Sequence, residues 1–149
     1  MTAEVPDAPQ EPRLLSNSEM KEKVDQFLSG RRWNIERRNK PVKIAKRFHF
    51  PTYDDAIDFT NVVAEIAKKE NHHPAILTEA QLVTVQTWTD HGISVSQEGG
   101  RKRANGITLR DVRLASLVEN AFVEQFVANG RYSEPRMRPP YEQPFEEME

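Results

Sequence analysis

Three of the four histidines in this 149-residue sequence lie in one stretch, "KKENHHPAILTEAQLVTVQTWTDHG", from Lys68 to Gly92. His72 and His73 are adjacent and precede a proline, and His91 follows a strand-like run. Imidazole can both donate and accept a proton near neutral pH, because its unperturbed pKa is about 6.5. The stretch therefore predicts acid/base chemistry, provided that the fold brings the three imidazoles together.

Two other roles compete for these histidines. A histidine pair at a helix end is often a cap or a packed polar group. Three histidines can also bind zinc, but adjacent histidines diverge on an extended chain, and no carboxylate spacing completes a site. We therefore expect no metal site.

The first predicted element is a helix over residues 18–29. A capping box joins Ser16 to Glu19, and Gly30 can close the C-terminus. The segments "RRWNIE" and "PVKIAKRFHF" then predict two strands of a half-buried hairpin. The apolar face of the helix consists of Met20, Val24, Phe27 and Leu28.

A second helix is predicted from the Thr52 cap to just before the histidine pair. Two short strands follow in "AILTEAQLVTVQTWT", and residues 92–106 form a glycine-rich, charged loop. Thr108 and Asp111 then cap a long helix that ends at Gly130. The order αββαββα predicts an α+β fold, a four-stranded antiparallel sheet with three helices packed on one face.

Composition excludes several classes of function. The net charge of −2 gives no overall basic field, so we expect no direct nucleic-acid partner. The sequence has no cysteine, which excludes disulfides, thiolate metal sites and a cysteine nucleophile. It also has no apolar run near the roughly 18 residues of a membrane span. Its first residues, "MTAEVPDAPQEPR", are too acidic and polar for a targeting peptide, so we expect a cytoplasmic protein with no membrane contact.

Proline placement predicts the domain limits. Most of the ten prolines lie near the two ends of the sequence, where they disfavour helix and strand. We expect a disordered tail over residues 1–13, one folded domain over residues 14–130, and a proline-rich acidic tail over residues 131–149.

Over about Leu14 to Phe126 the sequence resembles the pterin-4a-carbinolamine dehydratase family. The resemblance rests on the segments "LLSNSEMKEKV", "RRWNIE", "KRFHF", "WTDH" and "TLRDVRLA", and on the paired histidines before a proline. The residues that match the family signature are Lys68, His72, His73, Pro74, His91 and Asp111.

The resemblance implies a lyase that dehydrates 4a-hydroxytetrahydropterin in tetrahydrobiopterin biosynthesis, with the pterin as substrate and no further cofactor. It implies that His72 is the main acid/base group, and that His73 and His91 orient the substrate or complete proton transfer. Substrate-binding roles fall to Lys68, Pro74, Trp88 and Asp111. A tryptophan on a strand also suits a core, and Asp111 at the third position of a helix suits a cap, which we favour slightly.

The resemblance leaves a non-catalytic role open. Members of the family include Rubisco assembly factors and a dimerisation cofactor of a homeodomain transcription factor. Ala80 or Gln81 stands where the signature has an aromatic residue, and residues 92–107 lengthen the segment before Asp111. Both departures favour a protein-binding role, whereas the retained histidines favour an enzyme. In either case we expect a homodimer or homotetramer, since self-association covers edge strands.

Overall fold

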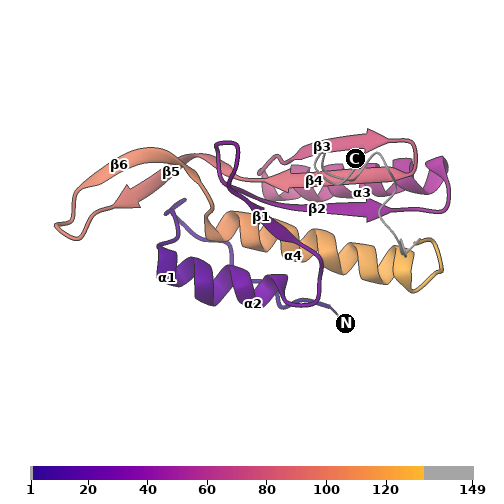
Figure 1. Ribbon diagram of the computed structural model, residues 1–149, viewed down its shortest axis with the longest axis horizontal. Helices are drawn as coiled ribbons and strands as arrows, with labels where there is room; N and C mark the ends of the chain where they lie inside the picture. The colour runs from indigo at the N-terminus through magenta and orange to yellow at the C-terminus, as the bar shows by residue number, and fades with distance from the viewer. Residues whose placement is uncertain (1, 133–149) are drawn as a thin grey trace, which may run out of the picture.

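A four-stranded antiparallel sheet forms the centre of the fold (Figure 1). The computed structural model describes residues 2–132. The strands lie in the order β1-β2-β4-β3, which confirms the predicted sheet. Their bounds are β1 (Asn34–Glu36), β2 (Lys43–His49), β3 (Ala75–Glu79) and β4 (Leu82–Thr87).

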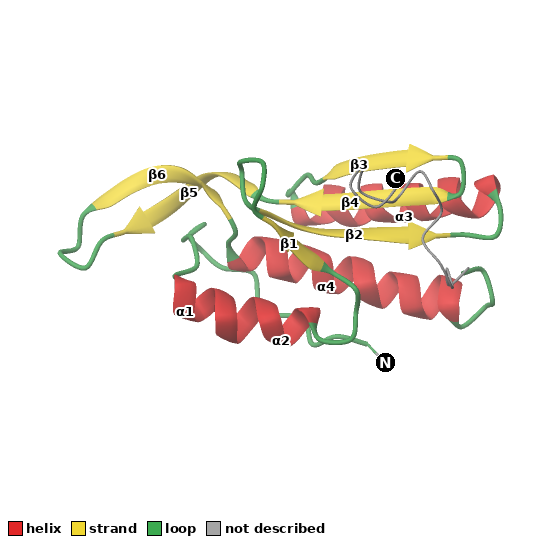
Figure 2. Ribbon diagram, viewed as in Figure 1, coloured by secondary structure: helices red, strands yellow, loops and turns green. Residues whose placement is uncertain are grey.

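Three helical regions accompany this sheet, in the predicted order along the chain (Figure 2). The side chains of Ser16, Thr52 and Thr108 cap the helix starts as predicted. None of the helices within residues 2–132 has the length and apolar character that crossing a membrane requires. The first region comprises α1 (Asn17–Glu19), the π-helical turn η1 (Met20–Val24) and α2 (Asp25–Leu28); the others are α3 (Tyr53–Glu70), and α4 (Leu109–Phe122) with its π-helical continuation η2 (Val123–Val127).

A second, two-stranded sheet was not predicted. Residues 92–106, expected to form a loop, belong mostly to β5 (Thr89–Val95) and β6 (Arg101–Gly106), which project from the end of the domain (Figure 1). Side chains on this ribbon are largely exposed, and β6 carries one apolar side chain, Ala104, so this strand lacks the alternation of a half-buried strand. Gly92 fits where a Cβ atom would lie 2.5 Å from Leu14 Cδ2.

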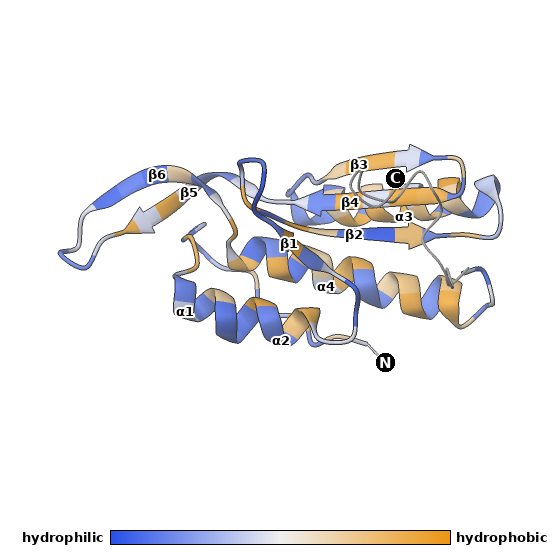
Figure 3. Cartoon of the chain, viewed as in Figure 1, coloured by the Kyte–Doolittle hydropathy of each residue, from blue (hydrophilic) through white to orange (hydrophobic). Residues whose placement is uncertain are grey.

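Aromatic rings fill the core between the sheet and the helices. Phe48 on β2 lies 4.6 Å from Phe59 of α3 and 4.8 Å from Phe122 of α4, measured between ring centroids. Phe50 and Phe126 extend the same cluster. Apolar residues recur along β4 and α4, whereas most of α1 is hydrophilic (Figure 3). The sheet thus has one face packed against α3 and α4.

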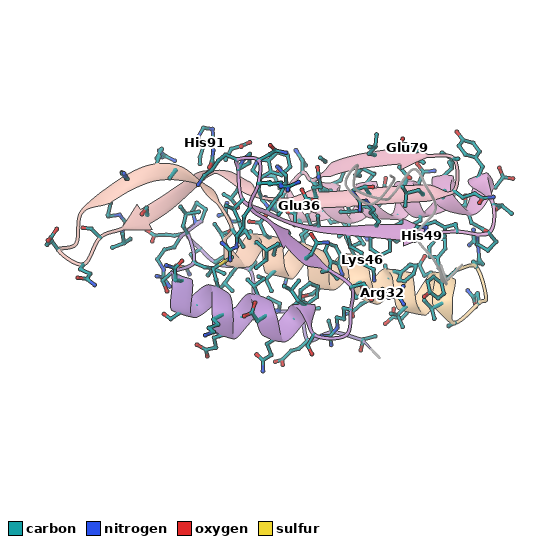
Figure 4. All side chains as sticks on the ribbon, in the orientation of Figure 1. Arg32, Glu36, Lys46, His49, Glu79 and His91 are labelled. Carbon is teal, nitrogen blue, oxygen red and sulfur yellow. The ribbon has the colours of Figure 1, made fainter. Side chains whose placement is uncertain are left out.

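A charged pair is buried inside this core. Lys46 Nζ lies 2.8 Å from Glu119 Oε1, and the same oxygen accepts a 2.7 Å hydrogen bond from Trp33 Nε1. The ammonium group is also 4.7 Å from the Phe48 ring centre and 4.9 Å from that of Phe122. Burial lowers the pKa of Lys46, and the attraction of Glu119 opposes this shift. Figure 4 shows the position of Lys46 between the sheet and α4.

The N-terminal segment differs from the disordered tail that we expected for residues 1–13. Residues 2–12 form no helix or strand, but they contact the domain. Ala3 is 7% exposed and joins the core, and its backbone exchanges two hydrogen bonds with the side chain of Asn120. Proline-rich composition shows that a segment lacks regular structure, but does not show whether it packs. In the expected C-terminal tail, residues 133–149 lie outside the described part.

The buried pair leads to a prediction for stability. Glu119→Gln keeps the side-chain shape but leaves the Lys46 ammonium without its counter-charge. The free energy of unfolding should fall by about 3 kcal/mol, since removing one partner of a buried ion pair leaves an uncompensated charge. Urea denaturation measures the change, with exposed Glu124→Gln as the control. A loss no larger than that of the control would contradict the account.

The lowered pKa of Lys46 predicts a pH dependence. Between that lowered value and the ordinary value of 10.5, the unfolded chain binds a proton that the folded chain lacks. The contribution of Lys46 to stability therefore rises with pH across this window. The unfolding free energy of the wild type minus that of Lys46→Met should increase as pH approaches 10.5, in denaturation series at several alkaline pH values. A difference that falls with pH would refute the sign.

Candidate active site

The carboxylate of Asp111 is fully buried at the start of α4. Its Oδ2 accepts the backbone N–H of Thr108 at 2.9 Å, which completes the predicted capping box. The hydroxyls of Thr87 and Thr89 donate to its two oxygens at 2.7 and 2.9 Å. A buried carboxylate needs such donors to replace its lost hydration. Asp111 therefore links the start of α4 to the end of β4 and the start of β5.

His72 completes the set of groups around this carboxylate. Its Nε2 lies 2.6 Å from Asp111 Oδ1, and its side chain is only 14% exposed. The turn after α3 brings it there: Asn71 has a left-handed backbone with φ of 50°, and the His72 N–H donates to the Ala67 carbonyl. The left-handed Asn71 and this hydrogen bond belong to a Schellman motif, a common helix ending. The predicted cap role of Asp111 is confirmed, but the carboxylate also holds an imidazole.

This contact sets which ring nitrogen of His72 can accept a proton. An ionised carboxylate only accepts hydrogen bonds, so Nε2 carries the hydrogen, and in the neutral ring Nδ1 holds the free lone pair. The pair can therefore act as an oriented acid/base group.

His73 is exposed and lies two residues before β3. Ala75 pairs with Gln86 in the antiparallel ladder of β3 and β4. From this register and the alternation of an extended chain, we infer that His73 faces the side that the helices leave open. The adjacent histidines diverge, as their extended backbone requires.

Trp88 lies in a row of polar side chains on this open face. The Lys43 Nζ is 5.3 Å from the centre of the Trp88 ring, and the indole N–H donates to Asp90 Oδ1 at 2.8 Å. Glu36 belongs to the same row and accepts a hydrogen bond from Gln86 at 3.1 Å. Trp88 is therefore partly exposed beside charged groups, not a core residue.

His91 lies on the projecting β5–β6 ribbon. We expected the three imidazoles to face one cleft, but His91 is exposed on β5, and Figure 4 shows it on the side of the ribbon turned away from α4. The β5–β6 pairing is irregular between Thr89 and Gly92, which disturbs the alternation of side chains there. Thr89, not His91, reaches the Asp111 carboxylate from this strand.

The other two predicted site residues lie at the margin. Lys68 is 71% exposed at its side chain, and its Nζ lies 3.3 Å from Glu65 on the same helix. Pro74 is partly buried and connects His73 to β3. Lys68 thus points to solvent rather than toward His72.

A cavity of about 220 Å³ lies beside His72. Its walls come from the end of α3, the start of α4 and the N-terminal segment; His73 and His91 do not line it. Within residues 2–132, no three histidine or acidic side chains gather in an arrangement that could hold a metal ion. The lining residues are Ala8, Pro9, Glu70, Asn71, His72, Arg110 and Arg113.

The residues around Asp111 were not identified from the sequence. Thr87 and Thr89 alternate in "QTWTD", so they share one face, but threonines are common in strands for other reasons. Arg113 and Glu70, which form a 2.5 Å ion pair next to the cavity, are far apart in sequence. Their association depends on how α4 packs against the end of α3.

Residues 13–121 match the model of the family described as pterin 4 alpha carbinolamine dehydratase. A protein of Chlorobaculum tepidum, provisionally named pterin-4-alpha-carbinolamine dehydratase, is 38% identical over 87 residues, which are 58% of this chain and 68% of the relative.

A solved structure is also similar. It is the crystal structure of a transcriptional coactivator/pterin dehydratase from Brucella melitensis, with a TM-score of 0.51 and 24% sequence identity. The match covers 71% of this chain and 95% of that chain. At this identity the similarity shows that the two proteins share a fold.

The hydrogen bonds of Asp111 predict a large effect on stability. Asp111→Ala leaves the donors of His72, Thr87, Thr89 and Thr108 without their acceptor, and should lower the free energy of unfolding by about 3 kcal/mol or more. Asp111→Asn keeps one acceptor oxygen and should cost less. The control is Asp54→Asn, an exposed carboxylate in the first turn of α3. Equal stability of Asp111→Ala and the control in urea denaturation would contradict this role.

Proposed function

Since the chain belongs to the pterin 4 alpha carbinolamine dehydratase family, we propose that it converts 4a-hydroxytetrahydropterin to quinonoid dihydropterin and water. This reaction would recycle a tetrahydrobiopterin-type cofactor. The observation that supports it best is the 2.6 Å contact between His72 and the fully buried carboxylate of Asp111. This contact fixes the orientation of the imidazole, as a proton-transfer group requires.

The reaction is an elimination of water. The bond from C4a to the hydroxyl oxygen breaks, the proton on N5 leaves, and a double bond forms between C4a and N5. One group must protonate the departing hydroxyl and another must accept the N5 proton, so no electrons are exchanged with a partner. Two positioned acid/base groups meet these requirements, and each typically contributes about 10²-fold to 10⁴-fold.

We assign the main acid/base role to His72, whose orientation Asp111 fixes. His73, the next residue, supplies the second imidazole from the open face, where Trp88 offers a flat surface to the pterin ring. We place the ring at the end of the sheet, beside the loop that joins α3 to β3. The position of His91 gives it no part in this proposal.

A protein-binding function is the second candidate. The cavity beside His72 excludes the other two histidines, and the β5–β6 ribbon projects with three exposed basic residues, Arg101 to Arg103. The Brucella melitensis protein is described as a coactivator as well as a dehydratase. Both candidates are compatible with self-association through the outer strands β1 and β3 of the sheet, and with a cytoplasmic location.

Turnover of 4a-hydroxytetrahydropterin, followed by absorbance, tests the proposal. His72→Ala should lower kcat by about 10²-fold or more and change pterin affinity little, because proton transfer is needed only in the transition state. His73→Ala should also lower kcat, and the double variant should lose less than the product of the two effects.

Two histidines serve as matched controls. His49 lies at the far end of β2 and His91 on the projecting ribbon (Figure 4), so His49→Ala and His91→Ala should keep nearly full turnover. Absence of turnover in the wild-type protein would reject the dehydratase function and favour the protein-binding function. Full turnover in both His72→Ala and His73→Ala would reject the assigned roles.

A further inference from the structure

The N-terminal segment is fixed to α4 at its beginning. The backbone N–H of Ala3 donates to Asn120 Oδ1 at 2.5 Å, and Asn120 Nδ2 donates back to the Ala3 carbonyl at 2.9 Å. The side-chain amide of Asn120 thus pairs with the backbone of Ala3 as a peptide group of a neighbouring strand would. The Ala3 side chain is buried in the core cluster. The first anchor therefore combines hydrogen bonds with apolar contact.

A second anchor lies in the middle of the segment. Arg113 Nη1 donates to the Pro6 carbonyl at 2.9 Å. The same guanidinium binds both carboxylate oxygens of Glu70, at 2.5 and 3.3 Å. Glu70 ends α3, two residues before His72. Arg113 thus connects the N-terminal segment to the turn that positions the imidazole.

The segment is fixed again at its far end. Glu11 forms a 2.8 Å ion pair with Arg101 of β6. The Pro12 carbonyl accepts the N–H of Ile93 at 2.8 Å, and the Leu14 N–H donates to the Ile93 carbonyl at 2.9 Å. Residues 12–14 therefore pair with β5, where Arg13 and Ile93 form a parallel bridge.

Between the second and third anchors, the segment crosses the cavity beside His72. Ala8 and Pro9 form one wall of this cavity, opposite the start of α4. The His72 side chain is 14% exposed, whereas His73 and His91 are exposed. The segment that lines this cavity together with His72 is thus held at three points.

We propose that residues 2–12 are a strap that forms the outer wall of the cavity beside His72 and controls the access of small molecules to its imidazole. Any consequence of this access for catalysis rests on the proposed dehydratase function. The control of access to His72 does not rest on it.

The strap can open without unfolding the domain. Of residues 2–12, only Ala3 is buried, so docking removes little apolar surface from water. Segments with few buried contacts open at a lower free energy than the core around them. Its prolines restrict the undocked chain, which reduces the entropy lost on docking.

The reactivity of each histidine toward diethylpyrocarbonate tests the proposal. Modification rates at His72, His73 and His91 are measured by peptide mass spectrometry, so the exposed histidines act as internal references. Ala3→Arg places a charge in the first anchor and should raise the rate at His72 at least about fivefold, with the references unchanged. Asn120→Ala should act in the same direction.

Matched variants separate strap release from other effects. Thr2→Arg adds the same charge at an exposed neighbouring position and should leave the rate at His72 unaltered. Deletion of residues 2–11 should expose His72 fully, and a synthetic peptide of residues 1–13 should restore protection. Urea denaturation establishes that each variant is folded; if the deletion variant is not, Ala3→Arg and Asn120→Ala decide the question.

An unchanged rate at His72 in folded Ala3→Arg and Asn120→Ala would overturn the proposal. Strap-dependent reactivity in a protein without dehydratase turnover would uphold the strap and reject the proposed function. Turnover that needs His72, with reactivity independent of the strap, would uphold the function and reject the strap.

Discussion

The buried carboxylate of Asp111 is the constraint on which the site depends. Four donors from separate parts of the chain converge on it: the Thr108 amide, two threonine hydroxyls and the His72 ring. A carboxylate without water must be surrounded in this way, because each missing hydrogen bond carries a desolvation cost. The requirement fixes the start of α4 against β4 and β5, and it holds the turn after α3 in place. Helix capping and imidazole orientation are therefore two effects of one buried charge.

This constraint explains why two adjacent histidines have different surroundings. Once Asp111 holds His72 on the helix side, an extended backbone directs His73 away from it. The two neighbours are thus a shielded imidazole with a fixed ring and an exposed one. The other buried charge, Lys46 with Glu119, lies in the aromatic core, and we assign it to stability rather than chemistry.

Patterns in the sequence predicted the elements that bury one apolar face. The caps at Ser16, Thr52 and Thr108, and the strands around residues 79–81, were identified because their signals are local. The β5–β6 ribbon was missed because both its faces are largely exposed and its second strand begins "RKR". The family resemblance pointed to His72 and Asp111, but not to their direct contact, which depends on the packing of α3 against α4. The place of His91 on the projecting ribbon could not be predicted for the same reason, since the ladder of that ribbon is irregular there.

The tautomer of His72 tests the central claim most directly. Long-range ¹H–¹⁵N NMR spectra of the ¹⁵N-labelled protein distinguish the two ring nitrogens of each neutral histidine. Neutral His72 should carry its hydrogen on Nε2, in a bond to Asp111, and its Nδ1 should be unprotonated. A neutral His72 with its hydrogen on Nδ1, or a ring that exchanges freely between both forms, would contradict this assignment.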